Sequence, residues 1–382
     1  MAEIAETVKK TNASFCLECG KCSAACPVAQ VNDSYSPRRM VSHSLQQSSD
    51  DVVFDPMLWA CLTCKNCEAG CPADVDYSTL TLGIRSQAKQ VGQTALCSHG
   101  GALQSLMRIM TAPDLNQQRL NWVNDDLKIA QEGEVLYFVG CAPYFDAFFA
   151  DLGVRTLDAS KSVVKLLNNV GIEPVLMADE RCCGHDLLWS GDEENFKKLA
   201  QKNIETIQKT GAKKVVFSCP ECYRTLQEDY PAHFGALGFD SFHISEFISD
   251  KLQSKEVMFP TNNRDLQATF QDPCRLGRHL GVYEAPRQVL SNLPGVTFNE
   301  MPKNSQRAVC CGVSNWMNCT TFSKQIQVQR LRQAKATGAD TLITACPKCE
   351  IHFRCAMKDQ NLGAEITMDI KNIATIAAES LP

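Results

Sequence analysis

The sequence lacks the features that would mark a membrane-spanning, exported or nucleic-acid-binding protein. No uninterrupted apolar run approaches the roughly 18 residues that suggest a transmembrane helix. Residues 1–15 hold no apolar segment followed by a small-residue cleavage site, so nothing suggests export. The 38 Lys and Arg residues are outnumbered by 43 Asp and Glu residues, and the basic ones are scattered along the chain. We therefore expect a cytoplasmic protein that does not bind nucleic acid and that a partner could hold at a membrane surface.

Cysteine is the abundant residue type, with 21 among 382 residues. In a small secreted protein this density would predict a disulfide framework, but this chain is large and its cysteines are grouped as metal ligands are. With 44% hydrophobic residues the chain can form two or three globular domains.

Two runs of cysteines near the N-terminus share one spacing, which is that of bacterial ferredoxins. In such runs the fourth cysteine binds the cluster of the other run. Two zinc sites would also use eight thiolates, but zinc knuckles pair two Cys-x2-Cys halves, without a third cysteine and a trailing Cys-Pro. The expected ligands of two [4Fe-4S] cubanes are Cys16, Cys19, Cys22 and Cys71 for cluster 1, and Cys61, Cys64, Cys67 and Cys26 for cluster 2.

Helical signals surround these runs. Ser36 and Pro37 fit the N-cap and first position of a helix, so residues 1–90 are predicted to form an α-helical ferredoxin domain. Apolar residues at helical spacing from Ala102 to Met110 predict a helical connector over 91–132.

From the buried-strand pattern at 135–139 onward, the chain repeats itself. Residues 211–222 and 338–349 align without a gap, and each pair of cysteines there follows a strand pattern and begins a helix. In each copy a Cys-Cys-Gly triplet precedes this aligned segment. A helical pattern lies between the triplet and the segment, at 196–209 in the first copy and at 322–336 in the second. Such alternation predicts parallel α/β modules over 133–262 and 263–382, and hence a mixed fold of α+β and α/β type. Each module has five cysteines, namely Cys141, Cys182, Cys183, Cys219 and Cys222, then Cys274, Cys310, Cys311, Cys346 and Cys349.

These motifs resemble those of the catalytic iron-sulfur subunits of heterodisulfide reductases, either the D-type subunit or fused C and B subunits. The resemblance implies a noncubane [4Fe-4S] cluster in each module, and a substrate disulfide split between the two clusters. The reaction would then take place at the clusters held by Cys182, Cys183, Cys310 and Cys311. It also implies a partner that donates electrons, either a flavin-containing A-type subunit or a membrane cytochrome b, and a substrate such as the heterodisulfide of coenzymes M and B. Similar subunits of glycolate oxidase and glycerol-3-phosphate dehydrogenase instead relay electrons from flavin toward quinone, which is the alternative function.

Polar residues beside the modules' cysteines are weaker candidates. His185, Arg275, Arg278 and His279 could bind an anionic substrate or supply protons, but could equally satisfy buried backbone groups. Cys97, Cys319 and Cys355 have no counterpart in the other repeat or run, and we interpret them as structural thiols.

Overall fold

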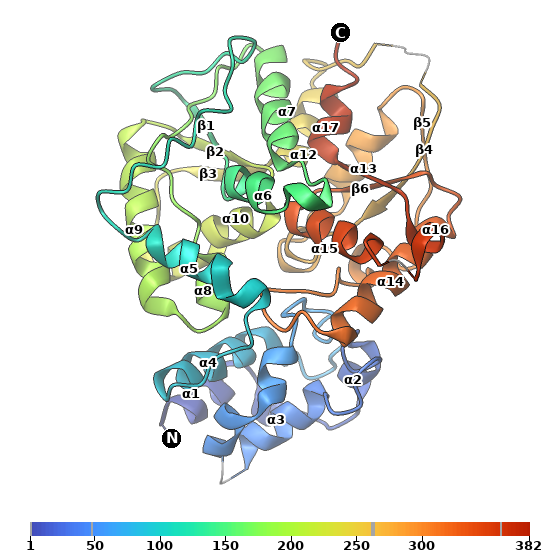
Figure 1. Ribbon diagram of the computed structural model, residues 1–382. Coiled ribbons are helices and arrows are strands. Elements are labelled where there is room, and N and C mark those ends of the chain that lie inside the picture. The colour runs from blue at the N-terminus through green and yellow to red at the C-terminus, as the bar shows by residue number, and fades with distance from the viewer. Residues whose placement is uncertain (1, 47–48, 261–263, 360) are drawn as a thin grey trace. The chain divides into compact units, whose positions relative to one another are not determined.

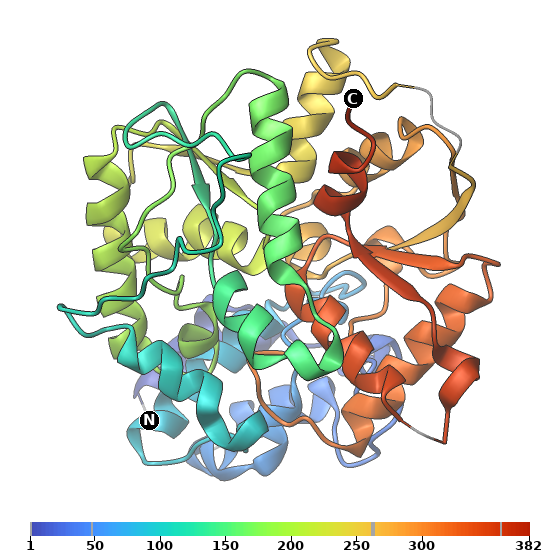
Figure 2. The ribbon, with the colours of Figure 1, turned by 45° about the horizontal axis from the view of Figure 1, so that its top comes forward.

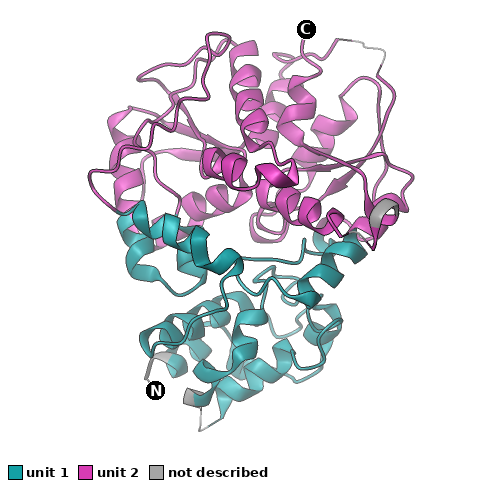
Figure 3. Ribbon diagram, viewed as in Figure 1, with its two compact units in different colours: residues 1–111, 184–198, 306–330 teal, residues 112–183, 199–305, 331–382 magenta. Residues whose placement is uncertain are grey.

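The computed structural model describes residues 2–46, 49–260, 264–359 and 361–382 (Figure 1). The chain forms two compact units, each built from several segments (Figure 3). Unit 1 comprises residues 1–111, 184–198 and 306–330, and unit 2 comprises residues 112–183, 199–305 and 331–382. The units interleave along the chain, so the domain boundaries expected at 91, 133 and 263 stay predictions about the sequence repeats.

Unit 1 is built mainly from helices. The predicted N-cap is confirmed, because the Ser36 side chain accepts a hydrogen bond from the backbone N–H of Arg39 and Pro37 begins the helix. The connector expected to be helical over 91–132 is an α-helix only over Ala102–Ile109, after a 3-10 turn at Ser98–Gly101, and residues 111–132 form turns and irregular loops instead. The helices are α1 (Ala2–Lys10), α2 (Lys21–Ala25), α3 (Pro37–Leu45), α4 (Tyr77–Gln90), α5 (Ala102–Ile109) and α8 (His185–Trp189).

Unit 2 contains two parallel sheets with matching topology. One has the order β1-β2-β3 and the other the order β5-β4-β6-β7. The first sheet has an isolated parallel bridge from Val175 to Leu136 of β1, in the place that β5 takes beside β4. The strands are β1 (Val135–Phe138), β2 (Lys214–Phe217), β3 (Asp240–His243), β4 (Leu266–Gln271), β5 (Val296–Phe298), β6 (Thr341–Thr344) and β7 (Asp369–Asn372).

The central strands are apolar on both faces, as parallel strands covered by helices must be. Val215, Val216 and Phe217 of β2 are fully buried, and so are Leu342 and Ile343 of β6. The predicted helices before these strands are confirmed as α9 (Glu193–Lys209) and α14 (Thr321–Lys335).

The two sheets are joined through a layer of four helices, seen between them in Figures 1 and 2. Helix α7 (Thr156–Asn169) of the first repeat packs against α17 (Ile373–Ala378) of the second. Helix α12 (Ile244–Gln253) packs against α13 (Glu284–Ser291) in the same way. Helices α7 and α13 each follow the first strand of their repeat, and α12 and α17 each follow its last strand, so the two contacts are equivalent, as in two copies related by an approximate two-fold axis. Within the described part of the chain, no helix is both long and apolar enough to cross a membrane.

Candidate iron-sulfur sites

Four cysteines of unit 1 line one pocket with about 320 Å³ of empty space. Cys61, Cys64 and Cys67 come from the second run, whereas Cys26 is the last cysteine of the first run. Burial raises the pKa of the Cys26 thiol, and the neighbouring Cys64 and Cys61 add to this shift. Four thiols that line one pocket match the ligand number of a cubane cluster, which binds one thiolate on each iron. We call this set the inner site.

Local backbone geometry positions the inner site. Cys61 directly follows a 3-10 turn (Pro56–Ala60), and Thr63 then adopts a left-handed conformation with φ of 47°. This turn lets the Thr63 N–H donate a hydrogen bond to Cys61 Sγ at 3.3 Å. Asn66 Nδ2 donates to the Ala25 carbonyl at 2.6 Å, next to Cys26, and so ties the two runs together.

The remaining cysteines of the two runs form an outer site. Burial raises the pKa of the Cys22 thiol, and the charges of Cys16 and Cys71 add to it, so Cys71 of the second run lies near the first run. Cys19 is exposed, as are the neighbouring Phe15 and Leu17. The structure therefore brings Cys26 and Cys71 each to the opposite run, as an exchanged ferredoxin arrangement requires.

Four cysteines of the first module gather at the carboxyl ends of parallel strands. The neighbouring Cys182 thiol and burial raise the pKa of the Cys183 thiol, and the neighbouring Cys183 and Cys219 thiols and burial raise the pKa of the Cys222 thiol, so these four cysteines lie close together. Cys219 follows β2 and precedes α10 (Pro220–Arg224). Cys141 follows the neighbouring strand β1 and caps α6 (Ala142–Phe148), so it lies at the same sheet edge. Five cysteine sulfurs thus belong to this edge, one more than a cubane cluster binds.

Buried polar side chains hold the backbone of Cys182 and Cys183, the two adjacent cysteines of this module. Asn203 in α9 donates to the Cys182 carbonyl at 3.1 Å and accepts from the Arg181 N–H at 2.9 Å. The Tyr230 hydroxyl donates to the Cys183 carbonyl at 3.0 Å, and Asn203 Nδ2 donates to that hydroxyl oxygen at 3.1 Å. Both side chains are completely buried, so the backbone of the pair is fixed by bonds that water cannot replace.

A buried ion pair links this pair of cysteines to Cys141. Arg119 Nη2 lies 2.6 Å from Glu180 Oε1 and also donates to the Gly140 carbonyl at 2.6 Å. Glu180 accepts from the backbone N–H groups of Val139 and Gly140 at 3.0 and 2.7 Å. Burial raises the pKa of Glu180 to about 7, while Arg119 and the two N–H groups act against that rise. The cysteine loops around Cys141 and Cys182 are therefore braced by one carboxylate.

The second module repeats the placement of its cysteines at strand ends. Cys274 lies just beyond β4, and Cys346 caps α15 (Pro347–Met357) after the neighbouring strand β6. Here Asp272 binds Arg287 with both carboxylate oxygens, at 2.8 and 3.0 Å, and accepts from the Ser305 N–H at 2.8 Å. Cys349 lies one turn into α15 and is buried.

Cys310 and Cys311 belong to unit 1 and are both buried. Cys311 Sγ lies 3.9 Å from the Val313 carbonyl oxygen. Gly312 has φ of 89°, and an added Cβ would lie 2.8 Å from the Ser323 carbonyl oxygen, so this position requires glycine. The corresponding Gly184 has φ of 81°, and an added Cβ would lie 2.8 Å from the ring of Phe196. The third residue of each Cys-Cys-Gly triplet thus serves close packing against the next helix.

The two Cys-Pro-x-Cys motifs meet through their variable residues. Glu221, between Cys219 and Cys222, forms an ion pair with Lys348, between Cys346 and Cys349. The two side chains are only 12% and 5% exposed. Because each residue occupies the same place in its repeat, this pair marks the contact of the two cysteine sites within unit 2.

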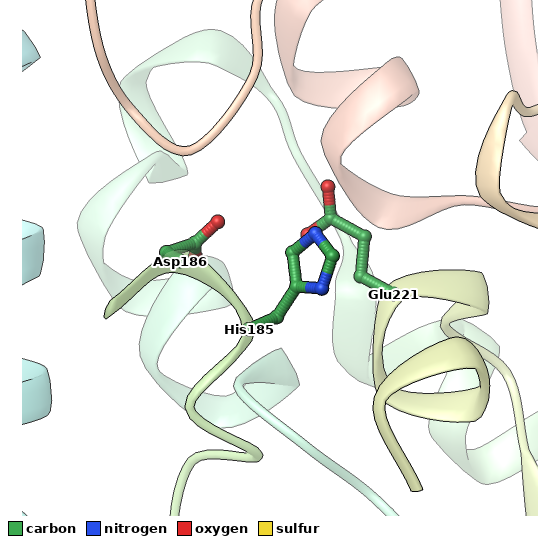
Figure 4. A group of neighbouring side chains, drawn as sticks. All are labelled: His185, Asp186 and Glu221. Carbon is green, nitrogen blue, oxygen red and sulfur yellow. The ribbon is translucent and has the colours of Figure 1, made fainter. Parts of the chain in front are cut away.

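Three of the four weaker polar candidates, His185, Arg275 and His279, are buried, and Arg278 is half-buried. Arg275 is buried, and its Nη1 lies 2.9 Å from His279 Nε2 and 3.9 Å from Cys274 Sγ. Arg275, Arg278 and His279 all belong to one π-helical turn (Arg275–His279). His185 begins α8 and its ring lies 6.0 Å from that of Trp189. Figure 4 shows His185 and Asp186 on α8 together with Glu221 of α10.

The three cysteines outside the patterns differ in exposure. Cys319 is exposed, whereas Cys97 and Cys355 are half-buried. Cys97 pairs with Met317 in an isolated antiparallel bridge, and Cys355 lies in α15. Their interpretation as structural thiols stays a prediction.

Sequence reasoning missed the residues that brace the first module, namely Arg119, Glu180, Asn203 and Tyr230. The one available signal was Glu180, an acidic residue two positions before a Cys-Cys pair. The second repeat has Ala308 at the corresponding position, so comparing the repeats could not reveal this role.

Replacing Gly140 by alanine is expected to empty the first module of iron. Gly140 has φ of 67°, and an added Cβ would lie 2.9 Å from Cys222 Sγ. The displaced thiol could no longer bind a cluster, so anaerobic iron analysis should show about four irons fewer per chain. Gly153→Ala is the matched control, because Gly153 has φ of 70° but nothing within 4 Å of its added Cβ. If both variants keep their iron, the position of Gly140 beside a cluster ligand is wrong.

Comparison with known protein families identifies the class. A profile of the cysteine-rich (CCG) domain matches residues 135–227 and 268–354, and a profile of the 4Fe-4S dicluster domain matches residues 12–75. The chain therefore belongs to the iron-sulfur proteins that join a 4Fe-4S dicluster domain to two cysteine-rich CCG domains, and it carries [4Fe-4S] clusters.

Individual relatives confirm the resemblance to heterodisulfide reductase. The chain is 29% identical to the D-type subunit of the dihydromethanophenazine:CoB–CoM heterodisulfide reductase of Methanosarcina barkeri, over 96% of this chain and 93% of the relative. It is 29% identical to the probable iron-sulfur-binding oxidoreductase FadF of Bacillus subtilis, over 78% of this chain and 43% of the relative. It is 24% identical to the B-type subunit of the fumarate reductase (CoM/CoB) of Methanothermobacter marburgensis, over 95% and 72%. The chain is thus an iron-sulfur oxidoreductase subunit related to these proteins.

Proposed function

We propose that this chain reduces a disulfide to two thiols as the iron-sulfur subunit of a heterodisulfide reductase-type complex. The inner and outer sites would hold two cubane [4Fe-4S] clusters, and each cysteine-rich module would hold one noncubane [4Fe-4S] cluster. When bound, the clusters supply one-electron redox chemistry at the cysteines that hold them. The reaction consumes two electrons and two protons, breaks the S–S bond and forms two S–H bonds.

The observation that carries this proposal is the pairing of two complete cysteine sets within one fold. Each module has all five cysteines, and the Glu221–Lys348 contact holds the two Cys-Pro-x-Cys motifs together. A disulfide has two sulfur atoms that must each gain one electron. Two equivalent sites related by an approximate two-fold axis suit such a substrate, whereas a simple one-electron relay does not require them.

Residues of the second module suit an anionic substrate. The Arg275 guanidinium lies beside Cys274 Sγ and carries a permanent positive charge. The M. barkeri relative is named for the coenzymes CoB and CoM. A heterodisulfide of two such thiol coenzymes, or a similar disulfide, is the substrate class that we propose. His185 and His279 remain candidate proton donors.

A partner subunit would deliver the electrons at the outer site. The exposed Cys19 and its apolar neighbours Phe15 and Leu17 make this the more accessible of the two cubane sites. A flavin-containing subunit or a membrane cytochrome b could each donate there, and the second would hold the chain at the membrane surface.

The second candidate function is electron relay between a flavin dehydrogenase and a quinone, without disulfide chemistry. A pocket in unit 1, with about 750 Å³ of empty space partly open to solvent, favours it. The pocket reaches Cys61 of the inner site and is lined by Met57, Trp59, Met317 and Phe322. An apolar, partly aromatic lining next to a cluster ligand suits a quinone ring.

An anaerobic assay of the isolated chain separates the two functions. Reduced viologen would be the electron donor, and either a disulfide or a soluble quinone the acceptor. The proposal predicts viologen oxidation with the disulfide at two electrons for each pair of thiols released. Viologen oxidation with the quinone alone would contradict it and favour the relay.

A further inference from the structure

The first cysteine of each module begins a different local structure. Cys274 is followed by the π-helical turn Arg275–His279, and the His279 N–H donates to the Cys274 carbonyl at 3.1 Å. Cys141 instead caps the regular helix α6. π-helical turns are rare and occur frequently at functional sites. The wider turn after Cys274 is therefore a feature of the second module that the first module does not have at this place.

The surrounding protein holds this wider turn in place. Gly277 lies in the middle of the turn, and an added Cβ would lie 2.6 Å from the ring of Tyr283. Leu276 is fully buried, and its carbonyl accepts a hydrogen bond from the Val282 N–H at 3.1 Å. The chain thus returns over the turn and packs an aromatic ring where only glycine leaves room.

The turn places the Arg275 side chain against the cysteine. Arg275 is 2% exposed, and its Nη1 lies 3.9 Å from Cys274 Sγ. The same nitrogen lies 2.9 Å from His279 Nε2. A guanidinium can only donate hydrogen bonds, so His279 Nε2 accepts, and the ring is neutral with its proton on Nδ1. His279 therefore orients Arg275 without cancelling its positive charge.

The first module has different charges at the equivalent places. Counted from the first cysteine, the neutral Ala142 corresponds to Arg275, and the acidic Asp146 corresponds to His279. The ion pair that joins the two Cys-Pro-x-Cys motifs has the same polarity, because Lys348 belongs to the second module and Glu221 to the first. Both differences place more positive charge beside the cysteines of the second module.

Other charged side chains near the cysteine loops form pairs of opposite charge. In the first module these are Arg119–Glu180, Arg181–Asp179 and Arg224–Asp229, and in the second they are Arg287–Asp272 and Arg354–Glu350. Within each such pair the two charges largely balance. These pairs therefore do not reverse the difference between the modules.

Reduction adds one negative charge to a cluster, so positive charge beside its ligands raises its reduction potential. We propose that Arg275, held beside Cys274 by His279, raises the reduction potential of the second module's cluster above that of the first. Electrons that arrive singly from the cubanes then collect first in the second module. Arg275 is a positioning residue, because it acts on the cluster through a ligand. This inference rests on the two noncubane clusters of the proposed function and not on the identity of the disulfide.

An anaerobic redox titration of the full chain without any disulfide, followed by electron paramagnetic resonance, tests the proposal. Cys222→Ala and Cys349→Ala remove equivalent proposed ligands from the first and second modules, so each leaves the signal of the other module beside the ferredoxin-type signals. The midpoint left in Cys222→Ala should be the higher of the two. Adding Arg275→Gln to Cys222→Ala should lower the reduced-to-oxidised ratio of the remaining cluster at a fixed ambient potential roughly tenfold, because a buried charge near a ligand is lost. For one electron this corresponds to a midpoint about 59 mV lower.

Two further variants in the same Cys222→Ala chain separate charge from packing. Arg275→Lys keeps a positive charge at this position and should retain most of the midpoint. Arg278→Gln is the matched control, because it removes a charge from the same turn at a half-buried position, and it should shift the midpoint less than Arg275→Gln does.

An unchanged midpoint in Arg275→Gln with the iron content of the parent chain would overturn the proposal, and so would an equal fall in Arg275→Lys. If Arg275 acts only on the substrate, the KM for the disulfide would rise while the substrate-free midpoint stays the same, which also overturns the proposal. Iron missing from the second module of the unmodified chain would refute the proposed function as well. Absence of disulfide turnover together with the predicted midpoints would refute the proposed function alone.

Discussion

Replacing Cys183 by alanine is expected to abolish disulfide reduction while the two ferredoxin-type signals persist. The Cys183 thiol is buried close to Cys182 and Cys222, so its loss would remove a proposed ligand from the centre of the first module. The cubane sites use none of these cysteines. Turnover in the viologen assay should fall by on the order of a thousandfold or more, as when one member of a catalytic group is removed.

The corresponding variant of the second module is Cys311→Ala, and it should have the same effect. If each sulfur of the substrate needs its own site, loss of either module is enough to stop the reaction. Cys319→Ala is the matched control, because Cys319 follows the same triplet but is exposed and outside the pattern. Normal turnover in both Cys183→Ala and Cys311→Ala would refute disulfide chemistry at the modules.

Reversing the charge of Lys348 is expected to separate the two modules. In Lys348→Glu two carboxylates would face each other in a nearly buried site, where their repulsion is poorly screened. Breaking a buried ion pair costs about 3–5 kcal/mol of unfolding free energy. For a unit of this size we expect a midpoint of thermal unfolding roughly 10 °C lower. Loss of visible cluster absorbance on heating measures it.

The charge swap distinguishes the pair from the individual residues. Glu221→Lys alone should lower the stability as much as Lys348→Glu does. The double variant should recover most of the stability, because the two residues occupy equivalent places in the two repeats and the swap restores an ion pair between them. Lys198→Glu is the control, since its pair with Glu194 is exposed on both sides, at 52% and 80%, and contributes little. If the double variant is no more stable than the single variants, attraction between the two side chains does not explain the effect, and the prediction is wrong.

Features with local sequence signals could be predicted. The ferredoxin spacing, the N-cap at Ser36 and the strand–cysteine–helix order at Cys219 and Cys346 each depend on neighbouring residues. The duplication added independent support, because two copies of one pattern predicted one α/β unit twice. The resemblance to heterodisulfide reductase subunits followed from these same motifs and is confirmed by the relatives.

Features that depend on distant contacts could not be predicted. Glu221 and Lys348 appear in the sequence as unremarkable residues between cysteines, and only the packing of the repeats makes them partners. Asn203 reaches the Cys182 backbone from the helix predicted at 196–209, and Tyr230 reaches the Cys183 backbone from a segment for which the sequence predicted no helix. Periodicity identifies a buried face and does not identify what that face touches.

The central claim is that thiolates hold iron in both cysteine-rich modules as well as in the ferredoxin part. The direct measurement is iron content and resonance spectroscopy of the chain purified without oxygen. We predict about sixteen irons per chain, four for each of four clusters, with signals of two ferredoxin-type cubanes and of a second, distinct type. About eight irons with ferredoxin-type signals alone would contradict the claim.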